Sequence, residues 1–213
     1  MPLMTGGQGV IRSLKAEGVE VVFGLPGVQI MHIYDAFFDT QGVRLITTRH
    51  EQTAAYMADG YARSTGRIGV ALVVPGPGLY NAGAALSTAY ASSSSVMLIS
   101  GQIHSQSIGK DMGALHEIRD QQEAVRPVTK WSYRLTHAAE IPAAIHEAVR
   151  QTSTGRPRPV EIEIPPDILS AETDLEMIEP EVYPRPLPDP KAVRDAAELL
   201  AEARRPLIWV GGG

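Results

Sequence analysis

Glu51 stands at the start of a segment in which small residues recur at helical spacing. At 3.6 residues per turn, one stripe of this helix holds Glu51 together with four alanines: Ala54, Ala55, Ala58 and Ala62. A helix buries such a stripe, so we expect the carboxyl group to point inward. Burial disfavours an ionised carboxyl group, which prepares it to donate a hydrogen bond near neutral pH. The alternative is an ordinary helix-start acid, favoured there by the helix dipole.

Three loops could place further chemistry beside this acid, because each follows a predicted strand. They are 24–27 (GLPG), 49–51 (RHE) and 75–78 (PGPG). The sequence contains neither a G-x-G-x-x-G nor a Walker lysine motif. Pro26, Pro75 and Pro77 lack a backbone N–H, so the proline loops suit rigid walls against a ring better than a phosphate cradle. Tight turns without a ligand are the alternative.

Composition excludes several other classes of site. The 213 residues include no cysteine, which rules out disulfides, thiolate metal sites and a cysteine nucleophile. His32, His104, His137 and His146 form no recognisable metal spacing, so no metal site is predicted. The net charge of -5, without a long basic run, gives no sign of a nucleic-acid surface. We expect no membrane segment and, in the absence of a signal-peptide pattern, a cytoplasmic location.

Short β-rich runs alternate with helical patterns along the first 164 residues. Strands are predicted at 19–23, 43–47, 68–74, 95–100 and 159–164, with a further short strand over 129–134. Helices are predicted at 6–17, 29–39, 51–65, 79–91 and 139–151. This order predicts an α/β fold: an open, mostly parallel sheet with helices on both faces, in three α/β/α layers. Ligands bind such sheets at the carboxyl ends of the strands, where the three loops lie.

The character of the sequence changes after residue 164. Residues 1–178 are predicted to form the first domain, whose last strand, PVEIEI, alternates and is expected nearer an edge of the sheet. Residues 179–190 contain five prolines and are predicted to be a linker. An amphipathic helix and a strand, LIWV, follow within 191–213. We interpret this tail as the start of a central domain, so the chain is expected to be the first part of a longer polypeptide.

Five segments in this order resemble the N-terminal pyrimidine-binding domain of thiamine-diphosphate enzymes, and the nearest group is the acetolactate synthase-like branch. They are FGLPG at 23–27, RHEQ-x-A-A-x-M-A-x-G-Y-A-R-x-T-G at 49–66, GPG-x-x-N at 76–81, SGQI at 100–103 and RPVTKWSY at 126–133. The resemblance covers residues 4 to about 170. It implies a decarboxylase or carboligase that acts on a 2-keto acid.

The resemblance also implies roles for single residues. Glu51 matches the catalytic glutamate that hydrogen-bonds N1′ of the cofactor pyrimidine and favours the tautomer whose N4′ removes the C2 proton. Pro26, Gly27, Pro77 and Asn81 match positions that line the pyrimidine and thiazolium rings. In this family a C-terminal domain with a G-D-G…N motif holds the diphosphate and Mg²⁺. Sites form between subunits, which implies a homodimer or homotetramer.

Three departures from the acetolactate synthase pattern put that particular activity in doubt. Val74 stands where threonine is usual, and 114–117 (ALHE) replaces A-F-Q-E, with His116 in place of the glutamine. Gln29 occupies a position that usually carries a small residue. Gln29 and His116 are therefore candidate substrate contacts, with packing or surface roles as the alternative for His116.

Two other functions stay open on the sequence. One is an FAD-containing oxidase of the same family, and the other is a non-catalytic subunit or binding module with the same fold. Glu51 weighs against a binding module, which has no need of a buried acid at that position.

Overall fold

The computed structural model describes residues 3–184 and 186–210 and divides the chain into two compact units, Met1–Glu181 and Val182–Gly213. The division falls inside the segment predicted as a linker. The second unit contains α8 (Pro190–Glu202), which begins where the Asp189 side chain accepts a hydrogen bond from the backbone of Lys191. The strand predicted over LIWV at 207–210 is not formed. A strand needs a neighbour for its backbone hydrogen bonds, and the described residues of this unit form no other strand.

The first unit is built on a six-stranded sheet in which every neighbouring pair is parallel. Its spatial order is β3 (Arg44–Thr47), β2 (Val21–Gly24), β4 (Gly69–Val73), β5 (Val96–Gly101), β7 (Val160–Ile164) and β6 (Trp131–Arg134). A separate antiparallel pair joins β1 (Met4–Thr5) to β8 (Glu172–Thr173). The predicted parallel α/β sheet is confirmed.

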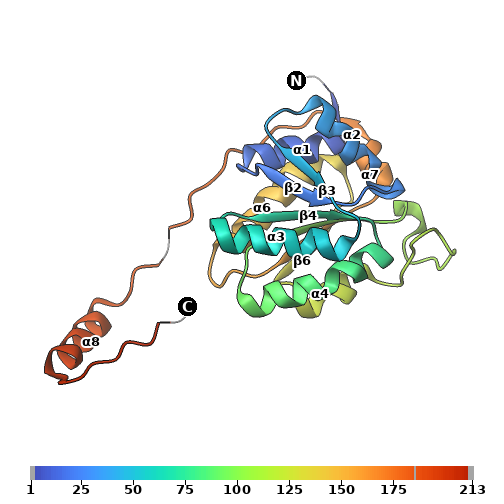
Figure 1. Cartoon of the computed structure of the whole chain (residues 1–213). Coiled ribbons are helices and arrows are strands. Elements are labelled where there is room, and N and C mark those ends of the chain that lie inside the picture. Colours follow the sequence, from blue (N-terminus) through green and yellow to red (C-terminus); the bar gives the residue numbers. More distant parts are fainter. Residues whose placement is uncertain (1–2, 185, 211–213) are drawn as a thin grey trace. The chain divides into compact units, whose positions relative to one another are not determined.

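Helices cover both faces of the sheet (Figure 1). One face carries α1 (Gly6–Ala16), α2 (Met31–Asp39), α6 (Ile141–Ser153) and α7 (Pro166–Ser170). The other carries α3 (Glu51–Thr65), α4 (Pro77–Ser92) and α5 (Gln121–Val125). Short 3₁₀ turns complete the unit: η1 (Val28–Ile30), η2 (Ser105–Ser107), η3 (Arg126–Val128) and η4 (Ala138–Glu140). No helix in the described ranges is long and apolar enough to cross a bilayer.

Alternate residues of the central strands serve two separate cores. Val70 and Leu72 of β4 pack into the core under α1, α2 and α6, whereas Ala71 and Val73 pack into the core under α3 and α4. Helix α3 lies very close to β4, since a Cβ added to Gly69 would stand 2.0 Å from the backbone oxygen of α3 at residue 58. This close packing fixes α3, and with it the position of Glu51, against the sheet.

Strand β7 differs from its prediction in one respect. It lies beside the edge strand β6, yet Glu161 and Glu163 are both fully buried. Polar partners make this possible: the Ser100 hydroxyl donates to Glu161 Oε1 over 2.6 Å. Arg134 forms an ion pair with Glu163, and Gln102 Nε2 donates to the same carboxylate over 3.3 Å. The alternation in the sequence therefore reflects a buried polar cluster on one face and not exposure to solvent.

Candidate active site

The three loops named from the sequence lie at one edge of the sheet, because all six strands run parallel. Val74 lies between two of them. A Cβ added to Gly27 would stand 2.2 Å from Val74 Cγ1, and one added to Gly78 would stand 2.6 Å from Cγ2. The loop after β2 and the start of α4 therefore meet across a single valine. The methyl groups at this position take part in apolar packing, which a threonine hydroxyl would not supply.

Glu51 is the first residue of α3 and keeps only 8% of its surface exposed. The helix begins here because His50, in extended conformation, accepts a hydrogen bond from the backbone N–H of Gln52 at its Nδ1 over 3.2 Å. His50 thus has a structural role as the N-cap of α3. The stripe of alanines below Glu51 is buried, as predicted. The carboxyl group points inward at the edge where the loops meet.

Asn81 of α4 orients this carboxyl group. Its Nδ2 donates to Glu51 Oε2 over 2.9 Å. The other oxygen, Oε1, has no hydrogen-bond partner among residues 3–184 and 186–210, and it lies 3.4 Å from the position of a Cβ on Gly78. One oxygen is therefore held by Asn81, and the other accepts no hydrogen bond from the described residues.

The predicted ring-lining residues differ in their exposure. Pro26, Pro77 and Asn81 are exposed, and Gly27 is half-buried. Pro77 is also the first residue of α4, where its missing N–H costs nothing and its fixed φ suits a helix. Of these residues, Asn81 contacts the acid directly, and the contacts of all four with a ligand stay a prediction.

Gly76 makes the turn between β4 and α4. Its φ of 55° and ψ of -108° form a conformation that residues with a side chain avoid. A Cβ at this position would also stand 2.3 Å from the backbone oxygen of His116. The segment around residues 113–117 therefore packs directly on the turn, and its backbone forms part of the same site.

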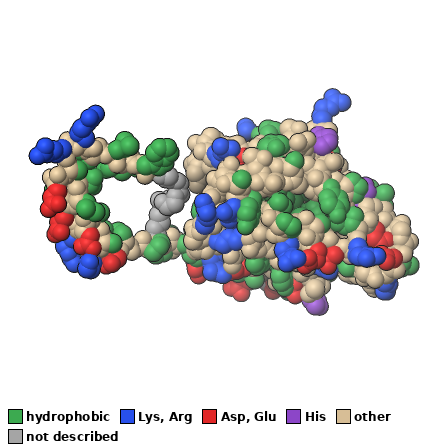
Figure 2. Space-filling model, turned by 90° about the horizontal axis from the view of Figure 1, so that it is seen from below, with side chains coloured by type: hydrophobic (Ala, Val, Ile, Leu, Met, Phe, Trp, Pro, Cys, Tyr) green, Lys and Arg blue, Asp and Glu red, His purple; other side chains and the backbone are tan. Residues whose placement is uncertain are grey.

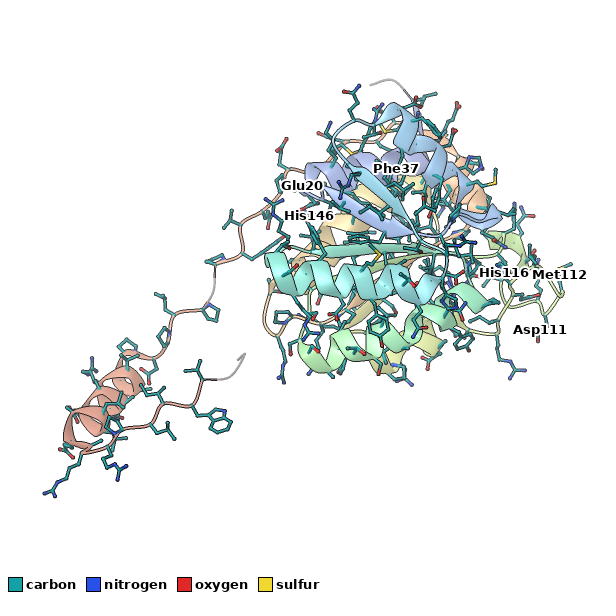
Figure 3. The ribbon with its side chains drawn as sticks, in the orientation of Figure 1. Glu20, Phe37, Asp111, Met112, His116 and His146 are labelled. Atoms are coloured by element: carbon teal, nitrogen blue, oxygen red, sulfur yellow. The ribbon has the colours of Figure 1, made fainter. Side chains whose placement is uncertain are left out.

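The two candidate substrate residues belong to this cluster of loops. Gln29 is 6% exposed, and its Nε2 donates to the backbone oxygen of Leu115 over 3.0 Å. His116 has a φ of 70°, and its buried Nδ1 has no hydrogen-bond partner in the described part of the chain. Figure 3 shows His116 at the end of the sheet near the start of α3, with Met112 and Asp111 farther out on the same loop. The structure brings the two residues to one region but gives the Gln29 amide a structural partner.

Gln121 is a residue of this region that sequence reasoning missed. It is fully buried, and its Oε1 accepts a hydrogen bond from Gly76 N over 3.0 Å. Nothing in the sequence DQQE separates Gln121 from the half-buried Gln122 beside it. The available signal was Asp120, whose side chain caps α5 by accepting from Glu123 N, because the cap fixes which residue begins the helix.

Residues 4–124 match the model of the family described as "Thiamine pyrophosphate enzyme, N-terminal TPP binding domain". The chain belongs to the thiamine pyrophosphate enzyme family. The resemblance to its acetolactate synthase-like branch is confirmed by the named relatives. The residues that match the family model include Glu51, Asn81 and all three loops.

Three relatives show how the similarity extends along the whole chain. A Pseudomonas aeruginosa protein named "Probable 2-ketoarginine decarboxylase AruI" is 42% identical over 99% of this chain. A Methanocaldococcus jannaschii protein named "Probable acetolactate synthase large subunit" is 39% identical over 99% of this chain. The Escherichia coli acetolactate synthase isozyme 3 large subunit is 37% identical over the full chain. The chain spans 36–38% of the length of these three relatives.

The site fits the ring half of thiamine pyrophosphate, also called thiamine diphosphate. Glu51 Oε1 can meet a ring nitrogen, and the prolines with Val74 offer apolar surface to a ring. The described residues contain no group of three or more His, Asp or Glu side chains that could hold a metal ion. Pro26 and Pro77 donate no backbone hydrogen bond to a phosphate.

Proposed function

We propose that this chain supplies the pyrimidine-binding, cofactor-activating half of a thiamine-diphosphate-dependent decarboxylase or carboligase acting on a 2-keto acid. The observation that carries the proposal is the pair of Glu51 and Asn81. It sets an inward carboxyl group, with one free oxygen, at the edge of the sheet where ligands bind. A helix-start acid that faces solvent would need no such partner.

In this proposal Glu51 holds and shares a proton at N1′ of the pyrimidine through its free Oε1. Asn81 keeps the carboxyl group oriented by donating to Oε2, so that the proton stays on the side of the ring. Pro26, Gly27 and Pro77 form the wall against which the rings lie. Bound thiamine diphosphate supplies the electron sink for the negative charge that a 2-keto acid leaves when it loses carbon dioxide. Mg²⁺ and the diphosphate are assigned to a C-terminal domain, and the whole protein to a homodimer or homotetramer.

The substrate is a 2-keto acid, for which the relatives suggest two kinds. One relative is named for the decarboxylation of 2-ketoarginine, and others for acetolactate synthesis. Val74 and the ALHE segment depart from the acetolactate synthase pattern. We therefore favour a reaction other than acetolactate formation. After carbon dioxide is lost, the remaining fragment of the 2-keto acid is either protonated or transferred to a different acceptor. Gln29 and His116 are the proposed specificity residues, because their loops adjoin the Gly76 turn.

The proposal is tested with the whole protein, Mg²⁺ and thiamine diphosphate. Carbon dioxide release is measured from pyruvate, from 2-ketoarginine and from aliphatic 2-keto acids, and the products are identified as aldehyde or acetolactate. We expect release that requires the cofactor and is lost in Glu51→Gln. No release from any 2-keto acid would favour a non-catalytic module, and oxygen consumption by a protein with flavin absorbance would favour the FAD-containing oxidase.

A further inference from the structure

Three buried side chains behind the Gly76 turn form one continuous chain of hydrogen bonds. Gln121 uses its full amide: Oε1 accepts from Gly76 N over 3.0 Å, and Nε2 donates to Ser100 Oγ over 2.9 Å and to the backbone oxygen of Gly101 over 2.8 Å. Ser100 then donates its hydroxyl proton to Glu161 Oε1 over 2.6 Å. Gln121, Ser100 and Glu161 are all 0% exposed. This series of hydrogen bonds thus begins at the Gly76 turn and ends at Glu161, inside the sheet.

The direction of these bonds is fixed by the chemistry of their members. The Gly76 N–H can only donate, so the Gln121 oxygen must face it and the Gln121 NH₂ group must face Ser100. The Ser100 hydroxyl, which accepts from Gln121, has its own proton free for Glu161. Glu161 Oε2 has no hydrogen-bond partner in the described part of the chain, which suits a neutral acid better than a buried carboxylate. Burial supports this state by raising the pKa of Glu161 to about 8.

The Gly76 turn, which these hydrogen bonds hold, leads directly into the proposed cofactor contacts. Gly76 precedes Pro77, the first residue of α4, and Asn81 lies one helical turn further on, where it orients Glu51. The backbone of Gly76 has a positive φ of 55°, and the backbone oxygen of His116 lies where a Cβ of this residue would project. A rotation of the peptide bond between Pro75 and Gly76 would therefore move the start of α4 relative to α3.

We propose that Gln121 is a positioning residue of the site, which holds the Gly76 turn through Ser100 and Glu161 and thereby sets Pro77 and Asn81 against Glu51. This inference rests on the proposed function, because Pro77 and Asn81 are its proposed cofactor contacts. Gln121 touches no reacting atom. Its effect on the reaction passes through the backbone of the turn.

The test replaces Gln121 by methionine, which has a similar length but neither the amide donor nor the oxygen acceptor, in the whole protein. Gln122→Met is the matched control, because it makes the same change one residue later on the same helix. We expect the Gly76 amide to exchange its hydrogen at least about tenfold faster in Gln121→Met. We expect thiamine diphosphate with Mg²⁺ to bind about tenfold more weakly, while exchange at Ile99 in the core of β5 stays unchanged. The control should leave all three quantities at the wild-type values.

Two further variants keep the test decisive. Gln121→Glu retains an acceptor for Gly76 N and should restore part of the amide protection and of the affinity, which a loss of packing alone would not predict. Ser100→Ala removes the middle link with little change in volume. It should shift both quantities in the same direction by a smaller factor, even if Gln121→Met does not fold.

The outcomes separate this inference from the proposed function. Faster exchange at Gly76 with unchanged cofactor affinity would overturn the positioning role and leave the proposed function intact. Equal losses in Gln121→Met and Gln122→Met would also overturn it. A wild-type protein that does not bind thiamine diphosphate would reject the proposed function and the inference together.

Discussion

At the scale of the residue, Glu51 differs from an ordinary helix-start acid in its hydrogen bonding. Its Oε2 is held by Asn81, and its Oε1 has no partner in residues 3–184 and 186–210. In Glu51→Gln the amide oxygen of the new glutamine can still accept the hydrogen bond from Asn81. The NH₂ group of the glutamine then lies where Oε1 of the glutamate was. That group can donate a hydrogen bond to a ring nitrogen, but it cannot transfer its proton.

We therefore expect the whole protein with Glu51→Gln to fold normally and bind thiamine diphosphate. The cofactor C2 proton should exchange more slowly by roughly 10²–10⁴-fold, the effect of losing a general acid–base group. Exchange is measured by NMR after acid quenching, with Glu172→Gln, an exposed glutamate, as the control. Wild-type exchange in a folded, cofactor-loaded Glu51→Gln protein would show that Glu51 only begins the helix.

Glu161 makes stability depend on pH in a direction opposite to that of most paired acids. Burial raises its pKa to about 8 in the folded chain, from an ordinary value of 4.5. Between these two values the folded state keeps a proton that the unfolded state has released. The free energy of unfolding should therefore fall as pH rises from about 4.5 to about 8, by at most about 1.4 kcal/mol per pH unit for this one proton.

Urea titrations of wild type and Glu161→Gln between pH 5 and pH 9 measure this effect, at roughly one-unit steps. The unfolding free energy of the wild type minus that of Glu161→Gln should fall as pH rises, because glutamine does not titrate. Glu172→Gln is the control and should track the wild type in parallel. A constant difference between wild type and Glu161→Gln would mean that Glu161 is ionised throughout the range.

At the scale of the element, hydrophobic periodicity predicted the fold well. Every predicted helix and strand in 6–164 is present, with boundaries that differ by at most two residues. Strands β4 and β5 could be predicted from their short, continuous apolar runs, because a strand buried on both faces has such a sequence. Strand β7 was harder, because Glu161 and Glu163 look like exposed positions until Ser100, Arg134 and Gln102 are seen beside them. These partners are distant in the sequence, and periodicity holds no information about them.

The candidate site was predictable to the same extent. The predicted strands located the three loops, the alanine stripe indicated that Glu51 points inward, and the resemblance then implied their roles toward a cofactor. The bond from Asn81 to Glu51 and the bond from Gln121 to Gly76 span 30 and 45 residues of sequence. Such contacts depend on how α3, α4 and α5 pack together. A single sequence fixes the type of each helix but not the register in which two helices meet.

The position of α3 on the sheet can be tested through two glycines. In Gly69→Ala the new methyl group would stand 2.0 Å from a backbone oxygen of α3, so the helix must move. We expect a destabilisation of roughly 1–3 kcal/mol or more, the cost of overpacking a core. Gly60→Ala is the matched control on α3 itself, because nothing lies within 4 Å of its new methyl group. It should stabilise the helix by roughly 0.5–1 kcal/mol.

Thermal unfolding of this chain measures both changes. In the whole protein, Gly69→Ala should also weaken cofactor binding, because a shift of α3 carries Glu51 away from Asn81. Equal stability of Gly69→Ala and wild type would mean that α3 is not held against β4 as closely as the structure shows.

At the scale of the whole molecule, the surface over α3 and α4 combines hydrophobic with charged side chains. Large hydrophobic side chains of α3 and α4 are exposed, namely Tyr56, Met57 and Tyr80. Figure 2 views the molecule from the side of these helices and shows hydrophobic side chains among both basic and acidic ones. This chain spans little more than a third of the length of these relatives.

In our proposal the cofactor site is divided between this chain and a C-terminal domain. The described residues contain no group of His, Asp or Glu side chains that could hold a metal ion, and Pro26 and Pro77 have no backbone N–H for a diphosphate. The 213-residue chain alone should therefore bind thiamine diphosphate weakly or not at all. Because only the ring half is recognised, thiamine without its phosphates should bind equally weakly, and Mg²⁺ should not change either affinity.

Calorimetry with both ligands, with and without Mg²⁺, decides the matter. The whole protein is the positive control, and there we expect tight, Mg²⁺-dependent binding of the diphosphate form alone. A micromolar dissociation constant corresponds to about -8.2 kcal/mol, more than a ring held by one hydrogen bond and an apolar wall should supply. Sub-micromolar, Mg²⁺-dependent binding to the isolated chain would place the diphosphate site within these residues and contradict the division between domains.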